Sequence, residues 1–326
     1  MKLKILIAIL FSFLFVLILL PHFTKPKILY KGFGWYGYLA DDEINEDSIQ
    51  LIKKLGGNTI NINVYYEYDL QNESFILLSN LTKLKEKIEL AHKNGLIVFL
   101  SPFANLVGGR PTASQIFEPQ KFLFQAKNIS LQLARFAAEN NVEIFAVWNE
   151  LGLAFFKVPN STSLTNEWLQ NVKEEIRKIY SGILTTKEGV QLGLYENYNF
   201  SGYDCIGLTF YPFTDSFAED PYTNITYAGV RSLEEYERVV KEEFKRIEKL
   251  KEKFKINCVI LGEIGIDVVG DKFVGYDKES NETRAKAYEI ILKNGIGKID
   301  GFFFSKFEEA KNSNSILFKI FSKYFG

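Results

Sequence analysis

Histidine, cysteine and methionine are scarce in this chain of 326 residues, which contains two, two and one of them respectively. His22 lies beside the apolar amino-terminal run and His92 within a predicted helix, so we expect no metal cluster to be assembled from the histidines and cysteines. Cys205 and Cys258 each fall within a strand-like apolar run, where we expect small buried hydrophobic residues rather than a disulfide or metal ligands. The sequence therefore indicates a protein without a metal or another cofactor.

The chain also lacks an excess of either charge, since its formal net charge is -1 with 24% charged residues. Without a basic field, we expect no nucleic-acid partner, and no feature of the sequence indicates a protein partner. No linker rich in proline, glycine or serine divides residues 28–326. A segment of this length is sufficient for one large α/β domain with a substantial core.

The amino terminus differs in composition from the rest of the chain. Lys2 and Lys4 precede an apolar run over residues 5–20 that contains no charged residue, and Pro21 follows it. A run of this length lies between the core of a signal peptide and a full membrane-spanning helix. Because no small-residue cleavage site follows, we interpret residues 1–27 as an uncleaved signal-anchor helix in preference to a removed signal peptide.

The N-glycosylation sequons and the amino-acid composition give expectations about the cellular compartment and the source organism. Asn-x-Ser/Thr sequons begin at Asn72, Asn80, Asn128, Asn160, Asn199, Asn224 and Asn281. They suit an extracellular surface, although chance in an asparagine-rich chain is the alternative. With the apolar terminus, they predict an extracellular domain that is anchored to the cell membrane or secreted. The preference for lysine over arginine, abundant glutamate and isoleucine, and the single methionine are typical of a thermophilic source.

Apolar runs of strand length alternate with amphipathic segments over residues 28–326, the pattern of βα units around a parallel sheet. The expected strands are residues 32–38, 59–64, 96–102, 144–149, 190–195, 206–211, 258–263 and 301–304. The expected helices are residues 47–55, 81–93, 121–139, 165–183, 233–254 and 284–293. Eight such units without the glycine pattern of a dinucleotide-binding fold favour a closed (β/α)8 TIM barrel over an open doubly wound sheet.

One junction conflicts with a regular barrel. Residues 196–205 leave room for only a turn of helix, whereas a parallel crossover usually takes about a dozen residues or more. Either the fifth helix is vestigial, or the fifth strand does not lie at residues 190–195.

Two glutamates end the fourth and seventh expected strands. Glu150 closes the segment Val147-Trp148-Asn149-Glu150, and Glu263 stands in Gly262-Glu263-Ile264-Gly265. Catalytic groups of such barrels come from the carboxyl ends of the strands, and two carboxylates on separate strands can cleave a glycosidic bond. Taken singly, Glu150 could be an acid at a helix N-terminus and Glu263 an ion-pair partner. Their joint position favours catalysis.

The hypothesis is a retaining double displacement, in which Glu263 attacks the anomeric carbon and Glu150 protonates the departing oxygen. Tyr211, at the end of the sixth strand, is the natural hydrogen-bond donor to Glu263, although such a residue is also good core material. Asn149 would bind the sugar 2-hydroxyl. An aromatic surface for the apolar face of a sugar ring would come from Trp35, Trp148 and Tyr65.

These segments resemble the clan of (β/α)8 retaining glycoside hydrolases with catalytic glutamates on strands four and seven, which includes cellulases, β-mannanases and β-galactanases. Residues 147–151 are similar to the acid/base motif, residues 203–212 to the strand-six segment with its tyrosine, and residues 261–265 to the nucleophile motif. The endo-β-mannanase-like group is the most similar in size and in the strand-six segment. The resemblance implies that Glu150 is the acid/base and Glu263 the nucleophile, supported by Asn149 and Tyr211.

The chain departs from that clan at several strand ends. Many members place an arginine after strand two, histidines near strands three and six and a tryptophan after strand eight. The corresponding segments here are Asn63-Val64-Tyr65, Ser101-Pro102-Phe103, Phe210-Tyr211 and Phe304-Ser305-Lys306-Phe307. Lys306 is the one lysine expected near the barrel mouth, and no Schiff-base or phosphate-binding pattern accompanies it.

We therefore expect a membrane-tethered extracellular glycoside hydrolase that acts on a β-linked oligo- or polysaccharide of the β-mannan or β-glucan type. The alternative from another class is a catalytically inactive barrel that serves as a cell-surface carbohydrate-binding or structural protein. Binding without hydrolysis would distinguish the two.

Overall fold

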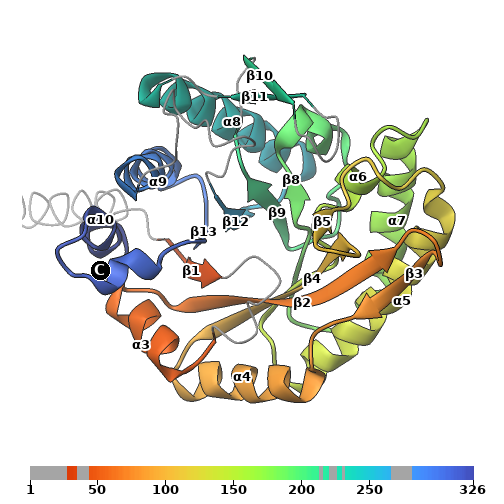
Figure 1. The fold of residues 1–326 in the computed structure, drawn as a ribbon, viewed down its shortest axis with the longest axis horizontal. Coiled ribbons are helices and arrows are strands. Elements are labelled where there is room, and N and C mark those ends of the chain that lie inside the picture. Colours follow the sequence, from red (N-terminus) through yellow and green to blue (C-terminus); the bar gives the residue numbers. More distant parts are fainter. Residues whose placement is uncertain (1–27, 35–43, 213–215, 220–225, 230–231, 266–280) are drawn as a thin grey trace, which may run out of the picture.

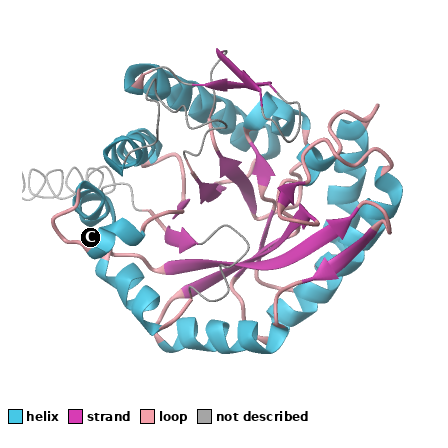
Figure 2. Ribbon diagram, viewed as in Figure 1, coloured by secondary structure: helices cyan, strands magenta, loops and turns pink. Residues whose placement is uncertain are grey.

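The computed structural model describes residues 28–34, 44–212, 216–219, 226–229, 232–265 and 281–326. Parallel strands form a closed ring within a layer of helices, and the β2–β4 pairing completes the circle (Figure 1, Figure 2). The predicted single (β/α)8 barrel is therefore confirmed. Residues 1–27, with the predicted anchor at residues 5–20, lie outside the described residues. None of the helices in the described part is long and apolar enough to cross a membrane.

Apart from strand five, the strands of the barrel lie at the expected apolar runs. They are β1 (Tyr30–Gly34), β2 (Thr59–Asp69), β4 (Ile97–Leu106), β6 (Ile144–Ala146), β7 (Ile183–Thr185) with β8 (Glu188–Gly189), β9 (Cys205–Phe210), β12 (Cys258–Ile264) and β13 (Gly301–Phe304). Short antiparallel strands extend the sheet: β3 (Ser74–Leu77) pairs with β2, and β5 (Arg110–Pro111) pairs with β4. The hairpin of β10 (Ser216–Glu219) and β11 (Thr226–Gly229) is separate from it.

Several of the helices begin where a side chain can bind the free N–H groups of the first turn. Asn45, Asn80 and Ser232 accept such hydrogen bonds. The helices of the described part are α3 (Glu46–Lys54), α4 (Leu81–Lys93), α5 (Pro119–Glu139), α6 (Leu151–Ala154), α7 (Ser161–Ile176), α8 (Leu233–Phe254), α9 (Asn281–Gly295) and α10 (Ile316–Phe325), with 3-10 helices η2 (Gln191–Asn197) and η3 (Glu308–Lys311). Their apolar faces cover the outside of the barrel.

The fifth strand does not lie at residues 190–195. Strand five is β7 and its continuation β8, which pair with β6 and β9. The expected strand is instead η2, in which Leu192 and Gly193 have φ angles of 64° and 63°. The segment misleads because it is apolar and Tyr195 is fully buried, while β7 is only three residues long and follows the predicted helix 165–183. The connection from β8 to β9 therefore contains a 3-10 helix and no α-helix.

The amino-terminal half of the barrel interior is filled by apolar side chains. Phe99 of β4 and Phe303 of β13 pack edge to face with ring centroids 5.0 Å apart, among Ile144, Ala146, Cys205 and Ile260. Gly32 of β1 makes room for this packing, because a Cβ there would lie 2.2 Å from Phe303 Cδ1. Asn61 of β2 lies at the same level as Phe99 and donates to its carbonyl at 3.0 Å, and the other large polar side chains follow toward the carboxyl ends of the strands.

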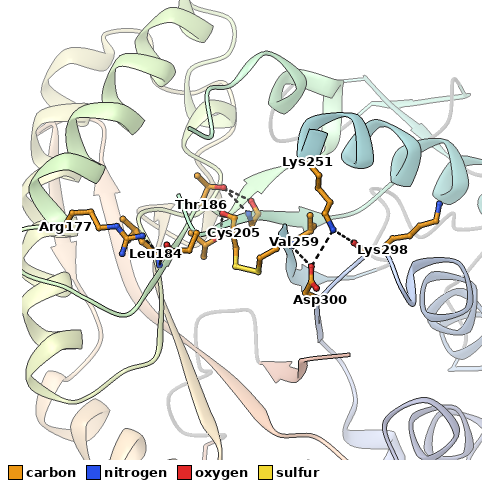
Figure 3. Close-up of a disulfide and its surroundings, with 12 residues drawn as sticks. Arg177, Leu184, Thr186, Cys205, Lys251, Val259, Lys298 and Asp300 are labelled. Atoms are coloured by element: carbon orange, nitrogen blue, oxygen red, sulfur yellow. Dashed lines mark hydrogen bonds and ion pairs between the residues drawn. A yellow bond between two sulfur atoms is a disulfide. The ribbon is translucent and has the colours of Figure 1, made fainter. Parts of the chain in front are cut away.

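The expectation that the cysteines act as unlinked hydrophobic residues is wrong, because Cys205 and Cys258 form a disulfide (Figure 3). They are direct register partners on the neighbouring strands β9 and β12, with Cα atoms 4.5 Å apart. A sequence separation of 53 residues conceals this proximity, which depends on the strand order and register of the barrel. The crosslink joins the two strands that lead to Tyr211 and Glu263.

Candidate active site

A layer of buried polar side chains lies toward the carboxyl ends of the barrel strands. Asn63 of β2 and Ser101 of β4 are register partners, and the Ser101 hydroxyl donates to Asn63 Oδ1 at 2.7 Å. The same layer contains Lys187 from strand five, Thr209 of β9 and Glu263 of β12. Each of these five residues is at most 6% exposed. Such a concentration of buried polar groups at the catalytic end of a barrel marks a candidate active site.

A bulge in β12 turns Glu263 into the barrel. Cys258 and Ile260 face the interior, so regular alternation would direct residue 263 outward with Val259 and Leu261. The pairing with β9 instead shifts after Leu261, so that Glu263 becomes the partner of Thr209. The extra residue is Gly262, where a Cβ would lie 2.9 Å from Phe99 Cε1. Bulges commonly redirect a side chain beside an active site.

Both carboxylate oxygens of Glu263 have partners. Tyr211 Oη donates to Oε1 at 2.8 Å, which confirms the expected hydrogen bond. Lys187 Nζ lies 3.0 Å from Oε2. This second contact is an ion pair, since Oε2 accepts no hydrogen bond of regular geometry from the described residues. The carboxylate is thus fixed in position by a phenol and a cation from the two sides.

Lys187 is the functional candidate that the sequence analysis missed, because the misplaced fifth strand left it in a presumed loop. Its side chain is fully buried, and its ammonium also lies 3.4 Å from Asn63 Oδ1. Burial lowers the pKa of Lys187, while the negative charges of Glu263 and Glu150 oppose that change. The lysine expected near the mouth, Lys306, is exposed.

Glu150 follows strand four in a left-handed conformation, with φ 53° and ψ 41°, immediately before α6. Its N–H donates to the Lys187 carbonyl at 2.7 Å, which ties the backbone of the fourth strand end to the fifth. The Thr209 hydroxyl donates to Glu150 Oε1. Because Thr209 is also the register partner of Glu263, one residue of β9 links the surroundings of both glutamates. Seven other non-glycine residues of the described part also have a positive φ, so this backbone conformation alone does not mark a functional site.

A third glutamate lies next to Glu150. Glu188 of β8 is 1% exposed, and its Oε2 accepts from the Gly152 N–H at 3.2 Å. Burial raises its pKa to about 8; the hydrogen bond from Gly152 opposes this change, and the charge of Glu150 adds to it. The raised pKa favours the neutral form of this buried carboxyl group next to Glu150, and sequence reasoning gave no sign of Glu188.

The remaining predicted site residues divide into two groups. Asn149 is buried, and its Oδ1 has no hydrogen-bond partner among the described residues, so it is suited to bind a ligand. Trp148 is 2% exposed and packs against Trp168 on the helix side of the barrel, with ring centroids 6.3 Å apart. Tyr65 is also buried, with its ring against Phe103. Neither ring offers a face to a sugar, and Trp35 lies outside the described residues.

Within the described ranges, no three side chains of histidine, cysteine, aspartate or glutamate converge as ligands of a metal ion. The groups that do converge are two carboxyl groups, an ammonium, a phenol and hydroxyls. They can transfer protons, attack an electrophilic carbon and bind neutral polar molecules.

Solved structures with the same architecture share little sequence with this chain. A GH113 β-mannanase from Alicyclobacillus acidocaldarius has a TM-score of 0.64 at 15% identity, with 91% of this chain and 96% of that chain covered. A GH5-4 broad specificity endoglucanase from an uncultured bacterium has a TM-score of 0.63 at 10% identity, with 92% and 95% covered. A GH5 family lichenase from a Caldicellulosiruptor species has a TM-score of 0.59 at 15% identity, with 86% and 84% covered. At such identities these likenesses establish the fold alone.

Sequence comparison gives a closer classification. No curated protein matches the chain. The model of the cellulase family, glycosyl hydrolase family 5, matches residues 27–299, which include the whole polar layer and both glutamates. The protein is a glycoside hydrolase, and the chain belongs to the cellulase family, glycosyl hydrolase family 5.

Proposed function

We propose that the protein hydrolyses a β-linked glycan by double displacement with retention of configuration. Glu263 attacks the anomeric carbon, and Glu150 protonates the departing oxygen and then takes a proton from the incoming water. Tyr211 holds the nucleophile, and Asn149 binds the sugar 2-hydroxyl through its unpartnered oxygen.

The observation that carries this proposal is the contrast between the surroundings of the two glutamates. Glu263 lies between an ammonium and a phenol, which favours an ionised carboxylate able to act as a nucleophile. Glu150 accepts from the neutral hydroxyl of Thr209 and has the buried carboxyl group of Glu188 nearby, which suits a proton donor. A pair of carboxyl groups in such different environments is the arrangement that acid and nucleophile roles require.

The proposed substrate is a polysaccharide of the β-mannan or β-glucan type. Similar folds include a β-mannanase, an endoglucanase and a lichenase, and the family is named for cellulases. The unpartnered Asn149 oxygen supports binding of a hydroxyl-rich ligand.

The test compares the full-length protein with its Glu263→Gln and Glu150→Gln variants at elevated temperature. New reducing ends are measured on β-mannans, β-glucans, β-galactans and xylans. We expect release on a mannan or glucan and a loss of at least about 10³-fold in either variant, since each removes a group that takes part in bond breaking. Glu248→Gln on the outer face of α8, where Glu248 pairs with Lys298, is the matched control and retains activity. Binding to a glycan without hydrolysis would instead support the inactive carbohydrate-binding barrel.

We also propose that the domain is extracellular and tethered to the membrane by residues 5–20. The disulfide supports an oxidising compartment, and the sequon residues Asn72, Asn80, Asn128 and Asn160 are exposed. Protease treatment of intact cells, followed by fractionation with and without detergent, tests both parts. Degradation on intact cells and recovery of the full chain only with detergent are expected. Protection in intact cells would contradict an extracellular domain.

A further inference from the structure

We propose that Lys187 is a positioning residue shared by both carboxyl groups: its ammonium balances the charge of Glu263 in the free enzyme and that of Glu150 in the glycosyl-enzyme. The inference rests on the proposed roles of the two glutamates. No other cation among the described residues has a side chain that pairs with either of them in the barrel interior.

The contacts of Lys187 join the two strand ends that bear the glutamates. Its carbonyl accepts from the Glu150 N–H at 2.7 Å, and its Nζ lies 3.0 Å from Glu263 Oε2. Asn63 Oδ1 lies 3.4 Å from the same ammonium, and the ring of Phe103 lies 6.0 Å from it. A fully buried ammonium is retained only where such groups compensate for its lost hydration. Lys187 therefore fixes the separation of the glutamates through its backbone and side chain together.

The charge of the site explains why one cation can serve both steps. In the first step a Glu263 oxygen bonds to the anomeric carbon, the glycosidic C–O bond breaks and the leaving oxygen takes the Glu150 proton. The negative charge thereby moves from Glu263 to Glu150. In the second step water bonds to the anomeric carbon and gives its proton to Glu150, and Glu263 leaves as a carboxylate. Lys187 contacts Glu263 through its ammonium and Glu150 through its carbonyl, so in this proposal one cation serves both carboxyl groups and the group of three stays neutral throughout.

Among the described residues, few other titratable groups lie near Lys187, Glu263 and Glu150. Tyr211 contacts Glu263, and Glu188 lies behind Glu150. Strands β2 and β4 contribute the neutral Asn63 and Ser101. After β13, the neutral Ser305 is buried and hydrogen-bonded to the Ile264 carbonyl, while Lys306 is exposed. Removal of the Lys187 charge should therefore act chiefly on Glu263 and Glu150.

The test uses full-length Lys187→Met, which keeps an unbranched side chain and removes the charge. Lys251→Met is the matched control, because Lys251 contacts Asp300 at the opposite end of the barrel (Figure 3). We expect the acidic limb of the kcat/KM profile to move up by about one to three pH units in Lys187→Met, since the Glu263 anion loses its counter-charge. A fall in kcat at every pH is expected too, because both steps lose the cation. Lys251→Met should keep the wild-type profile.

Two further measurements test the charge coupling between Lys187 and Glu263 and do not depend on enzymatic activity. A ¹³C titration of the Glu263 carboxyl, assigned by difference from Glu263→Gln, should show a midpoint at higher pH in Lys187→Met. Thermal unfolding should show that Lys187→Met/Glu263→Gln is more stable than Lys187→Met, because the double variant no longer buries an unpaired carboxylate.

The outcomes separate this inference from the proposed function. An unmoved acidic limb and an unmoved ¹³C midpoint, in an active and folded Lys187→Met, would overturn the role of Lys187 while hydrolysis stands. If Lys187→Met does not fold and the double variant is no more stable, the charge coupling is likewise contradicted. Retained activity in Glu263→Gln would instead overturn the proposed function, and the unfolding comparison would still report on the Lys187–Glu263 pair.

Discussion

Tyr211 Oη donates to Glu263 Oε1 at 2.8 Å across the neighbouring strand ends of β9 and β12. Gly265 leaves the space for the phenol ring, since a Cβ there would lie 2.2 Å from Tyr211 Cε1. In the proposed mechanism this hydrogen bond orients the attacking carboxylate, so its removal should slow the reaction.

Tyr211→Phe should lower kcat/KM by about 10- to 100-fold, because a hydrogen bond to a charged group contributes about 1.5–3 kcal/mol. Steady-state kinetics on the glycan identified by the substrate panel measures the effect. Tyr180→Phe is the control, since Tyr180 donates to the Val142 carbonyl away from the site. The control should lose stability and keep its activity. Equal kinetics in Tyr211→Phe and the wild type would show that the contact plays no part in catalysis.

Because the pKa of Glu188 is raised in the folded protein, we expect the free energy of unfolding to depend on pH. Its pKa is raised to about 8, so between about pH 4.5 and 8 the unfolded chain loses a proton that the folded protein keeps. Its contribution to stability is therefore complete below about pH 4.5 and falls as pH rises to about 8. Glu188→Gln cannot ionise, so its free energy of unfolding relative to wild type should increase from pH 5 to pH 8.

Denaturant unfolding at the two pH values measures this difference, with Glu248→Gln as the control for a surface glutamate that pairs with Lys298. An identical difference between Glu188→Gln and wild type at both values would mean that Glu188 is ionised in the folded protein.

The disulfide should stabilise the barrel without taking part in catalysis. Cys205→Ser/Cys258→Ser should lower the free energy of unfolding by about 4 kcal/mol, from the loop entropy of a crosslink that spans 53 residues. Reductant should destabilise the wild type by a similar amount and leave the double variant unaffected. While both proteins are folded, kcat/KM should agree within about twofold, because the crosslink lies in the apolar half of the barrel. Wild-type stability that does not respond to reductant would contradict the crosslink.

Glu150→Ala should separate the two steps of the reaction. Without the acid/base, a glycan with a poor leaving group reacts slowly, whereas an activated aryl glycoside still forms the glycosyl-enzyme. Azide needs no general base, so it should restore turnover of the aryl glycoside and give the β-glycosyl azide. Product analysis by NMR provides the measurement. An α-glycosyl azide from this variant would place the nucleophile, not the acid/base, at residue 150.

The sequence predicted most of the barrel because its long strands and helices carry strong periodic signals. Strands β9, β12 and β13 and helices α4 and α8 lie within one residue of the expected bounds. Strand five was misplaced because its three-residue β7 is shorter than any useful pattern, while the adjacent apolar run forms a 3-10 helix in which Tyr195 is buried and Leu192 is exposed.

The site was predictable only in part. Positions at strand ends identified Glu150, Glu263 and the Tyr211 contact. The partner of Glu263 on the other side, Lys187, could not be inferred, because its burial depends on the register of a strand that was misassigned. The direction of Glu263 itself depends on the bulge at Gly262, which period-two reasoning does not anticipate. Trp148 packs toward α5 and α7 and so cannot contribute to the predicted aromatic surface, whereas Trp35 lies outside the described residues and stays a prediction.

The most direct test of the account is to trap the covalent intermediate on Glu263. The wild-type protein is incubated with a 2-deoxy-2-fluoroglycosyl fluoride of the sugar identified by the panel, digested and mapped by mass spectrometry. The account predicts one sugar per chain, attached to the peptide that contains Glu263 and absent from Glu263→Gln. Attachment to Glu150 or to any other residue would contradict it.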